Sequence, residues 1–68
     1  MTKYTLILKH LYDEGEDVAI ATYTAAACRL AFKWYYHKLH NMAPWDHEVK
    51  ALEIYRGGHQ IKSQMIYD

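Results

Sequence analysis

The stretch Val49–Tyr67, VKALEIYRGGHQIKSQMIY, decides the fold that this sequence predicts. At its centre stands Gly57-Gly58, and glycine accepts the positive φ angles that a tight two-residue turn needs at both central positions. Alternating apolar and polar residues on either side are typical of strands. The stretch therefore predicts a hairpin made of Val49–Arg56 and His59–Tyr67.

The turn also predicts which residues of the two strands face each other. The expected pairs are Arg56 with His59, Tyr55 with Gln60, Ile54 with Ile61, Glu53 with Lys62, Leu52 with Ser63, and Lys50 with Met65. Opposite charges then meet at Glu53 and Lys62, which favours a ladder by roughly 0.2–1 kcal/mol. Ile61 and Met65 are expected on the face turned towards the core, and Ile66 on the opposite face.

A second hairpin is predicted at the start of the chain. The apolar segments Lys3–Tyr12 and Val18–Tyr23 flank an acidic run, Asp13–Asp17, with Gly15 at its centre. Lys3–Tyr12 carries apolar residues on both of its faces, which is typical of a central strand.

Between the hairpins, Ala25–Asn41 contains neither glycine nor proline and is predicted to be an amphipathic helix. Thr22 or Thr24 is expected to cap its first turn, because a threonine oxygen accepts a free backbone N–H there. The side facing the sheet is expected to hold Ala27, Cys28, Ala31, Trp34, Tyr35 and Leu39. The opposite side is expected to hold Arg29, Lys33, Tyr36, His37 and His40. Met42–His47 is predicted to be a connection in which Trp45 folds back over the core.

These elements predict one α+β domain, residues 1–68, with the order ββαββ and the helix on one face of a four-stranded sheet. The preference for right-handed crossovers favours the strand order 2-1-4-3. The layout, the opening Met1–Leu8 (MTKYTLIL), and Phe32-Lys33 followed by Tyr35 resemble the immunoglobulin-binding domains of streptococcal protein G. The resemblance does not extend to the acidic run, the end of the helix or the second hairpin, and it implies a shared topology alone.

Composition narrows the classes of function. The 68 residues carry eight basic and eight acidic side chains, so no global attraction to nucleic acid or to an anionic membrane is expected. A single cysteine, Cys28, excludes an internal disulfide and is expected to be buried under the helix. Without a disulfide, a leader pattern at Met1–Tyr4 or a membrane-length apolar run, the chain is expected in the cytoplasm.

No group of residues predicts catalysis, so the chain is expected not to be an enzyme and to hold no cofactor. His37 and His40 stand three residues apart on the predicted helix, and His47 and His59 could approach one another. No cysteine or glutamate completes the regular spacing of a zinc site, so solvated histidines are favoured over metal ligands.

Three surfaces remain as candidate sites of interaction. The helix face holds Arg29, Lys33, Tyr36, His37 and His40, a mixture of cations and rings that suits a protein or a nucleic acid, or that is simply solvated. The open sheet face holds Ile7, Lys9, Leu11, Tyr23 and Tyr55, either as scattered apolar residues or as a contact surface for a homodimer or partner. The acidic turn holds Asp13, Glu14, Glu16 and Asp17, as a solvated turn or as a contact for a basic partner.

The sequence therefore predicts a small non-catalytic protein-interaction module. It would resemble the accessory proteins of phages and mobile elements in type, and would inhibit or modulate a cellular protein by covering part of its surface. Aromatic anchors such as Trp34, Tyr36 or Tyr55 would supply most of the binding energy. The alternative is a small nucleic-acid-binding protein that uses the helix face.

Overall fold

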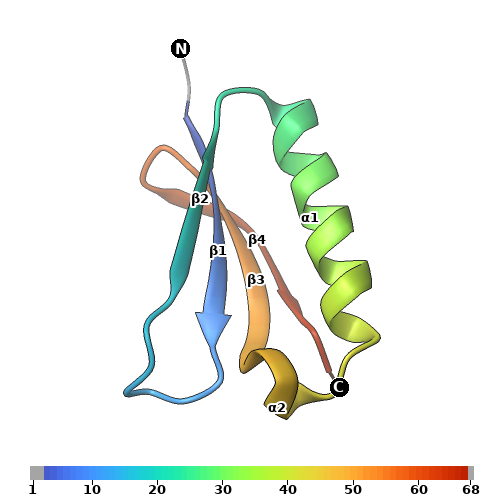
Figure 1. The fold of residues 1–68 in the computed structure, drawn as a ribbon. Coiled ribbons are helices and arrows are strands. Elements are labelled where there is room, and N and C mark those ends of the chain that lie inside the picture. The colour runs from blue at the N-terminus through green and yellow to red at the C-terminus, as the bar shows by residue number, and fades with distance from the viewer. Residues whose placement is uncertain (1–2, 68) are drawn as a thin grey trace.

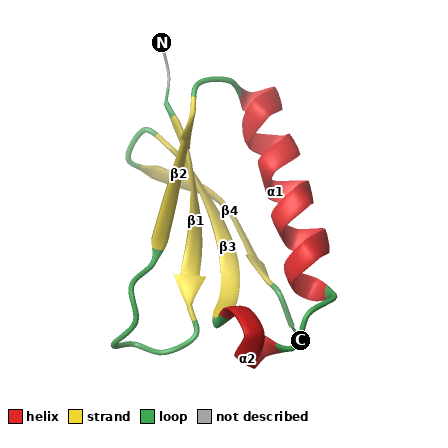
Figure 2. Cartoon of the chain, in the orientation of Figure 1, coloured by secondary structure: helices red, strands yellow, loops and turns green. Residues whose placement is uncertain are grey.

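The computed structural model describes residues 3–67, which form a four-stranded antiparallel sheet with one long helix on one face (Figure 1). The elements are β1 (Tyr4–His10), β2 (Val18–Thr22), α1 (Ala25–His40), α2 (Pro44–His47), β3 (Val49–Arg56) and β4 (His59–Met65). Figure 2 shows the two layers, with the short α2 at the end of the sheet where α1 finishes. The predicted α+β class and the ββαββ order of the main elements are confirmed. The prediction that no leader is present falls partly on Met1 and Thr2, which lie outside the described residues.

The predicted strand order 2-1-4-3 is wrong, because the order is β2-β1-β3-β4. β3 pairs antiparallel with β1, and β4 lies at the edge, so the topology implied by the resemblance to protein G is not adopted. β3 buries Ala51, Leu52 and Ile54, whereas every residue from His59 to Ser63 in β4 is exposed. A strand that is apolar on both faces is stabilised at the centre of a sheet, and a polar strand tolerates an edge.

The predicted register of the second hairpin holds next to the turn and then slips by one residue. Tyr55 faces Gln60 as predicted, but Lys62 lies opposite Ile54 because Ile61 is an extra residue in a β-bulge. Glu53 therefore faces Ser63, and the expected Glu53–Lys62 pair does not form.

The slip also exchanges the faces of the residues that end the chain. Met65 lies opposite Ala51 and is half exposed, while Ile66 is buried in the core and its backbone N–H donates to the Lys50 carbonyl. Both placements are the reverse of the prediction, since a shift of one residue turns each side chain to the other face of a strand. At the turn itself only Gly57, with φ of 61°, takes a positive φ angle.

The core lies between α1 and the central strands. It consists of Leu6, Leu8, Cys28, Leu39, Leu52, Ile54 and Ile66. Phe32, Tyr35 and Tyr36 of α1 pack against it, whereas Trp34 is 55% exposed and Ala27 is exposed. The prediction for buried Cys28 is confirmed, and the outward placement of Tyr36 and the inward placement of Trp34 are wrong.

Local hydrogen bonds mark both ends of α1. Thr24 is the cap, because its Oγ1 accepts the Ala27 N–H at 3.0 Å, while Thr22 lies in β2. After the helix, the Tyr67 hydroxyl lies 2.9 Å from the Leu39 carbonyl and 2.5 Å from the Met42 carbonyl.

Trp45 is 78% exposed in α2, so it does not cover the core as predicted.

His47 links α2 to the C-terminal segment. Its Nδ1 accepts the Val49 N–H at 2.9 Å, so the proton lies on Nε2, which donates to the Tyr67 hydroxyl at 2.6 Å. Desolvation, and then the nearby Asp46 carboxylate, raise the pKa of Tyr67, which keeps its hydroxyl protonated as a donor to the helix-end carbonyls.

Replacing Leu52 by alanine should destabilise the fold by about 2–5 kcal/mol, because Leu52 is fully buried and its removal leaves a cavity. The matched control is Leu30→Ala on α1, where the side chain is 69% exposed and the expected change is within about 0.5 kcal/mol. Urea unfolding followed by circular dichroism measures both. Equal losses in the two variants would contradict this description of the core.

Candidate functional site

The helix does not cover the whole sheet, and a groove opens beside it. α1 packs against β1, β3 and β2, which leaves the polar edge strand β4 beside the helix rather than beneath it (Figure 2). The groove has a volume of about 370 Å³. It is lined by Tyr4, Ala25, Cys28, Arg29, Phe32, Lys33, Ile54, Ile61 and Lys62.

The floor of the groove is apolar and its rim is cationic. Cys28 and Ile54 are buried at the bottom, with the half-buried ring of Phe32 beside them. Ile61 from the bulge is 55% exposed at the outer wall. All three charged residues of the lining, Arg29, Lys33 and Lys62, are cations.

Lys62 closes part of this groove. Its Nζ lies 4.4 Å from the centre of the Phe32 ring, a cation–π contact worth about 0.5–1 kcal/mol at an exposed site. The bulge at Ile61 brings Lys62 to this face. Sequence analysis missed Phe32, Ile61 and Lys62 as site residues, because it assigned Lys62 to the opposite face and the sequence carries no clear signal for the bulge.

The structure divides the predicted helix-face site. Arg29 and Lys33 are exposed and line the groove, and His37, one turn beyond Lys33, is also exposed. Tyr36 packs against the core, and His40 donates from Nδ1 to the Ile66 carbonyl at 2.8 Å. Arg29 and Lys33 are thus the two residues of the predicted face that lie together at a cavity.

An aromatic row continues from the groove towards the C-terminal segment. Its neighbouring rings are Phe32, Tyr36, His40, Tyr67 and His47, with centroids 5.4–6.3 Å apart and planes within 21° of parallel. Within this row, His40 and His47 stack on neighbouring rings and hydrogen-bond to backbone groups through their ring nitrogens, which indicates a structural role for both. His59, at the start of β4, lies at the other end of the sheet from His47, so the expected approach of these two histidines does not occur.

The open sheet face brings together three of its five predicted residues. Ile7, Lys9 and Tyr55 surround a shallow depression with Thr5, Asp17 and Glu53. Leu11 and Tyr23, the other two predicted residues, lie just beyond the ends of β1 and β2 and do not line this depression. With Ile66 also buried, the face is less apolar than predicted.

Polar contacts cross the remaining part of this face. The Tyr55 hydroxyl lies 3.1 Å from oxygens of both Glu53 and Gln60, and Lys9 Nζ lies 2.8 Å from Asp17 Oδ2. Desolvation and the hydrogen bond to Glu53 raise the pKa of Tyr55. These partners already occupy the groups that could orient a second molecule on this face.

The acidic turn contains one structural carboxylate and three outward ones. Asp17 Oδ1 accepts the His10 backbone N–H at 2.8 Å, and Oδ2 pairs with Lys9. The His10 N–H, and then Lys9, lower the pKa of Asp17. Asp13, Glu14 and Glu16 are exposed, so they remain the available part of the predicted acidic site.

His10 organises the loop that holds these carboxylates. Its Nδ1 accepts the Tyr12 N–H at 3.0 Å, and its Nε2 lies 3.1 Å from the Glu48 carboxylate. The Leu11 N–H donates to the Glu48 carbonyl at 2.7 Å, which ties the loop to the end of α2. A Cβ on Gly15 would overlap the His10 ring, so the close approach requires glycine there.

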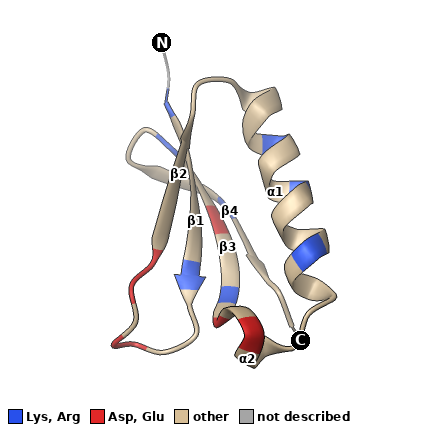
Figure 3. Cartoon of the chain, in the orientation of Figure 1, with Lys and Arg blue, Asp and Glu red and all other residues tan. Residues whose placement is uncertain are grey.

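Charge is separated along the molecule although the chain as a whole is neutral. Figure 3 shows acidic residues on the β1–β2 loop and on α2, at the end of the molecule away from the start of α1. Arg29 lies near the start of α1 and Lys33 near its middle, both at the groove. The protein therefore presents an acidic end and a cationic groove to other molecules.

Comparison with known proteins adds no relative. No protein-family model matches the chain, and no significant match is found among curated proteins or solved structures. Neither helix within residues 3–67 has the length and apolar character needed to cross a membrane. In the same residues no three histidine, cysteine or acidic side chains converge as metal ligands would.

Asp17 should make the stability of the protein depend on acid pH. Its pKa lies below the ordinary value of 3.8 in the folded state, so its contribution is present above that value and is lost as the pH falls through the lowered pKa. Urea midpoints of the wild type and Asp17→Asn should therefore differ at neutral pH and converge in strong acid. Asp13→Asn is the matched control, since its carboxylate is exposed and makes no hydrogen bond to a described residue, and its urea midpoint at neutral pH should match the wild type.

Gly15→Ala should destabilise the protein by about 1–2 kcal/mol, because the added methyl displaces the His10 ring from its hydrogen bonds. In a His10→Ala background the same substitution should cost less than about 0.5 kcal/mol, since the obstructing ring is gone. A double-mutant cycle of unfolding free energies measures the coupling. Additive effects would show that the ring and Gly15 are not in contact in solution.

Proposed function

We propose that this protein is a non-catalytic interaction module that binds another protein and modulates or inhibits it by covering its surface. The observation that carries the proposal is the groove between α1 and β4, where an exposed isoleucine and half-buried rings meet three cations. Apolar contact area with a charged rim is the usual anatomy of a protein interface. The rigid two-layer frame holds both walls of the groove in place.

Four described side chains that could perform chemistry are buried or hold backbone groups, which supports binding over catalysis. Cys28 is 2% exposed beneath α1, whereas a nucleophilic thiolate needs solvent access and an orienting base. His10, His40 and His47 each hold a backbone group through a ring nitrogen. A buried free thiol suits a reducing compartment, and the cytoplasm remains part of this proposal.

The second candidate is nucleic-acid binding, favoured by the alignment of Arg29, Lys33 and Lys62 along one groove. Three cations support only weak, salt-sensitive attraction to phosphates. Base stacking needs free ring faces, and the Phe32 ring already carries the Lys62 ammonium. Protein binding accounts for the apolar floor as well as for the cations, and we therefore favour it.

Affinity capture with Ile61→Asp tests the proposal. A tagged wild-type chain should enrich the same protein repeatedly from cells of its native host, and Ile61→Asp should lose it, because a carboxylate is placed in the apolar wall of the groove. Capture is measured by quantitative mass spectrometry.

The matched control is Val18→Asp on β2, whose side chain is 54% exposed and lies outside the groove. This variant should keep the partner at the wild-type level. A partner that survives Ile61→Asp and is lost in Val18→Asp would move the interface away from the groove. Enrichment of RNA or DNA that disappears in raised salt would favour the second candidate.

A further inference from the structure

We infer that the groove between α1 and β4 binds an acidic segment of the partner protein that inserts an apolar side chain between Phe32 and Ile61. The inference rests on the proposed function and specifies the chemistry of its partner. It follows from the charge of the lining, the blocked edge of β4 and the position of Lys62.

Charge complementarity selects an acidic occupant. Arg29 and Lys33 stand one turn apart on α1 and Lys62 faces them from β4, and no acidic residue within residues 3–67 lines the groove. Carboxylates that approach this rim meet cations on both walls, whereas a basic segment is repelled from both. The acidic residues of the β1–β2 loop and of α2 lie at the other end of the molecule, so they do not neutralise the cations of the groove (Figure 3).

The apolar floor of the groove indicates that the occupant also supplies an apolar side chain. Cys28, Ile54 and Phe32 line the floor, and a cavity of about 370 Å³ is at the lower end of the size range of ligand pockets. A side chain that enters it replaces water against apolar surface. Apolar anchors inserted into such pockets carry most of the energy of many interfaces, while surrounding charges set orientation.

The edge of β4 argues against a partner that simply adds a fifth strand. The bulge at Ile61 interrupts the regular ladder, and β4 carries Lys62 beside polar His59, Gln60, Ser63 and Gln64. Bulges and lysines on an edge oppose strand addition. Recognition therefore depends on side chains that enter the groove rather than on backbone pairing along β4.

The side chain of Lys62 can change its contact when an acidic segment enters the groove. In the free protein its ammonium lies over the Phe32 ring and covers part of the apolar floor. A partner carboxylate offers this ammonium an alternative contact of similar strength to the one with the ring at an exposed site. Pairing with it uncovers Phe32 for the apolar anchor, so charge and apolar contact act together.

The chain itself contains one segment of similar chemistry. In the β1–β2 loop the exposed carboxylates of Asp13, Glu14 and Glu16 stand between Tyr12, 52% exposed, and Val18, 54% exposed. This loop lies at the opposite end of the molecule from the groove and cannot reach it within one chain (Figure 1). A second copy is thus a distinct occupant, which the experiment must separate from a partner peptide.

Selection from a random-peptide display library on the immobilised wild-type protein tests the inference. Enriched peptides should combine Asp or Glu with a large apolar residue. Titrated into ¹⁵N-labelled protein, a synthetic copy of one should shift amide signals of residues 25–33 and 59–63. Binding should weaken about tenfold in Lys33→Ala and in Ile61→Thr, and on raising salt from about 50 to 500 mM.

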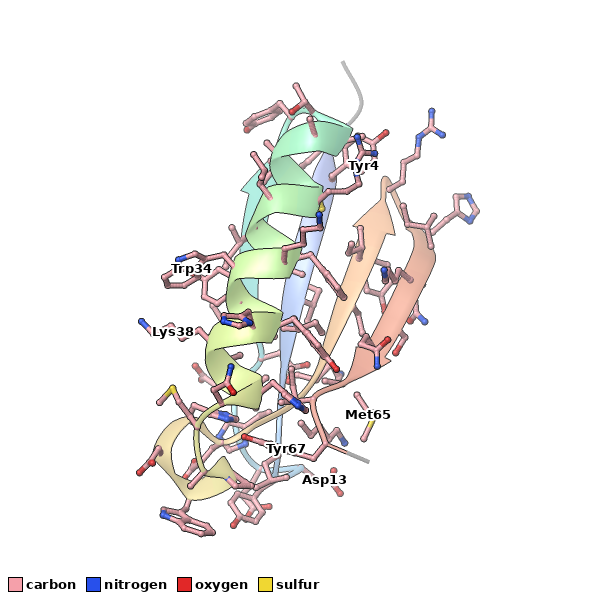
Figure 4. The ribbon with its side chains drawn as sticks, turned by 90° about the vertical axis from the view of Figure 1, so that its right-hand side faces the viewer. Tyr4, Asp13, Trp34, Lys38, Met65 and Tyr67 are labelled. Atoms are coloured by element: carbon pink, nitrogen blue, oxygen red, sulfur yellow. The ribbon has the colours of Figure 1, made fainter. Side chains whose placement is uncertain are left out.

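Two variants are matched controls for these effects. Lys38→Ala removes a cation from the same helix, but Lys38 lies over Trp34 on the flank turned away from β4 (Figure 4). Val18→Thr makes the same kind of change as Ile61→Thr at an equally exposed strand position. Both variants should bind the peptide as the wild type does.

Several outcomes would overturn the inference. They are enrichment of basic or uncharged peptides, shifts confined to the open sheet face, and tighter binding of an oligothymidine than of any selected peptide. Concentration-dependent sedimentation that is abolished by Asp13→Asn/Glu14→Gln would assign the groove to a second copy instead. If peptides fail while Ile61→Asp still loses the cellular partner, the inference fails and the proposed function stands.

Discussion

The antiparallel pairing of β3 with β1 is the constraint on which the rest of the structure depends. It places the two strands that hold buried residues side by side under α1, where Leu6 and Leu52 are fully buried. β4 is then the edge strand, and α1 packs over the other three. The groove exists because a helix that covers three strands leaves its flank facing the fourth. With β4 at the centre of the sheet, its polar residues would be buried and this flank would have no second wall.

The β-bulge at Ile61 gives that groove its chemistry. One extra residue turns Lys62 towards Phe32 and leaves Ile61 half exposed at the outer wall. It also places Met65 outside and Ile66 inside the core. Bulges commonly redirect side chains at sheet edges, and here the redirected side chains are a cation and an apolar contact. The same irregularity opposes pairing with another strand, so it favours side-chain recognition over aggregation.

Several histidines and tyrosines hold the ends of helices and loops in place through hydrogen bonds and ion pairs. Tyr67 and His47 close the end of α1 through the Leu39 and Met42 carbonyls, and His10 orders the acidic loop against Glu48. In a chain of 68 residues with no disulfide, such contacts add to a small core. They give a structural role to the histidines and tyrosines that make them.

The sequence by itself determined the local structure: a helix with a threonine cap, the buried Cys28, the strands, the glycine turn and the acidic loop. These features follow from periodicity, capping and turn chemistry, which act between residues close in the chain. Arg29 and Lys33 were also identified as a cationic surface from helical spacing. Only the tertiary structure decided the strand order, the bulge and the partners of Lys62, Met65 and Ile66. Those features depend on which strands pair across the sheet. Pairing is decided by burial against residues distant in the chain, so the residue spacing within one segment does not predict it.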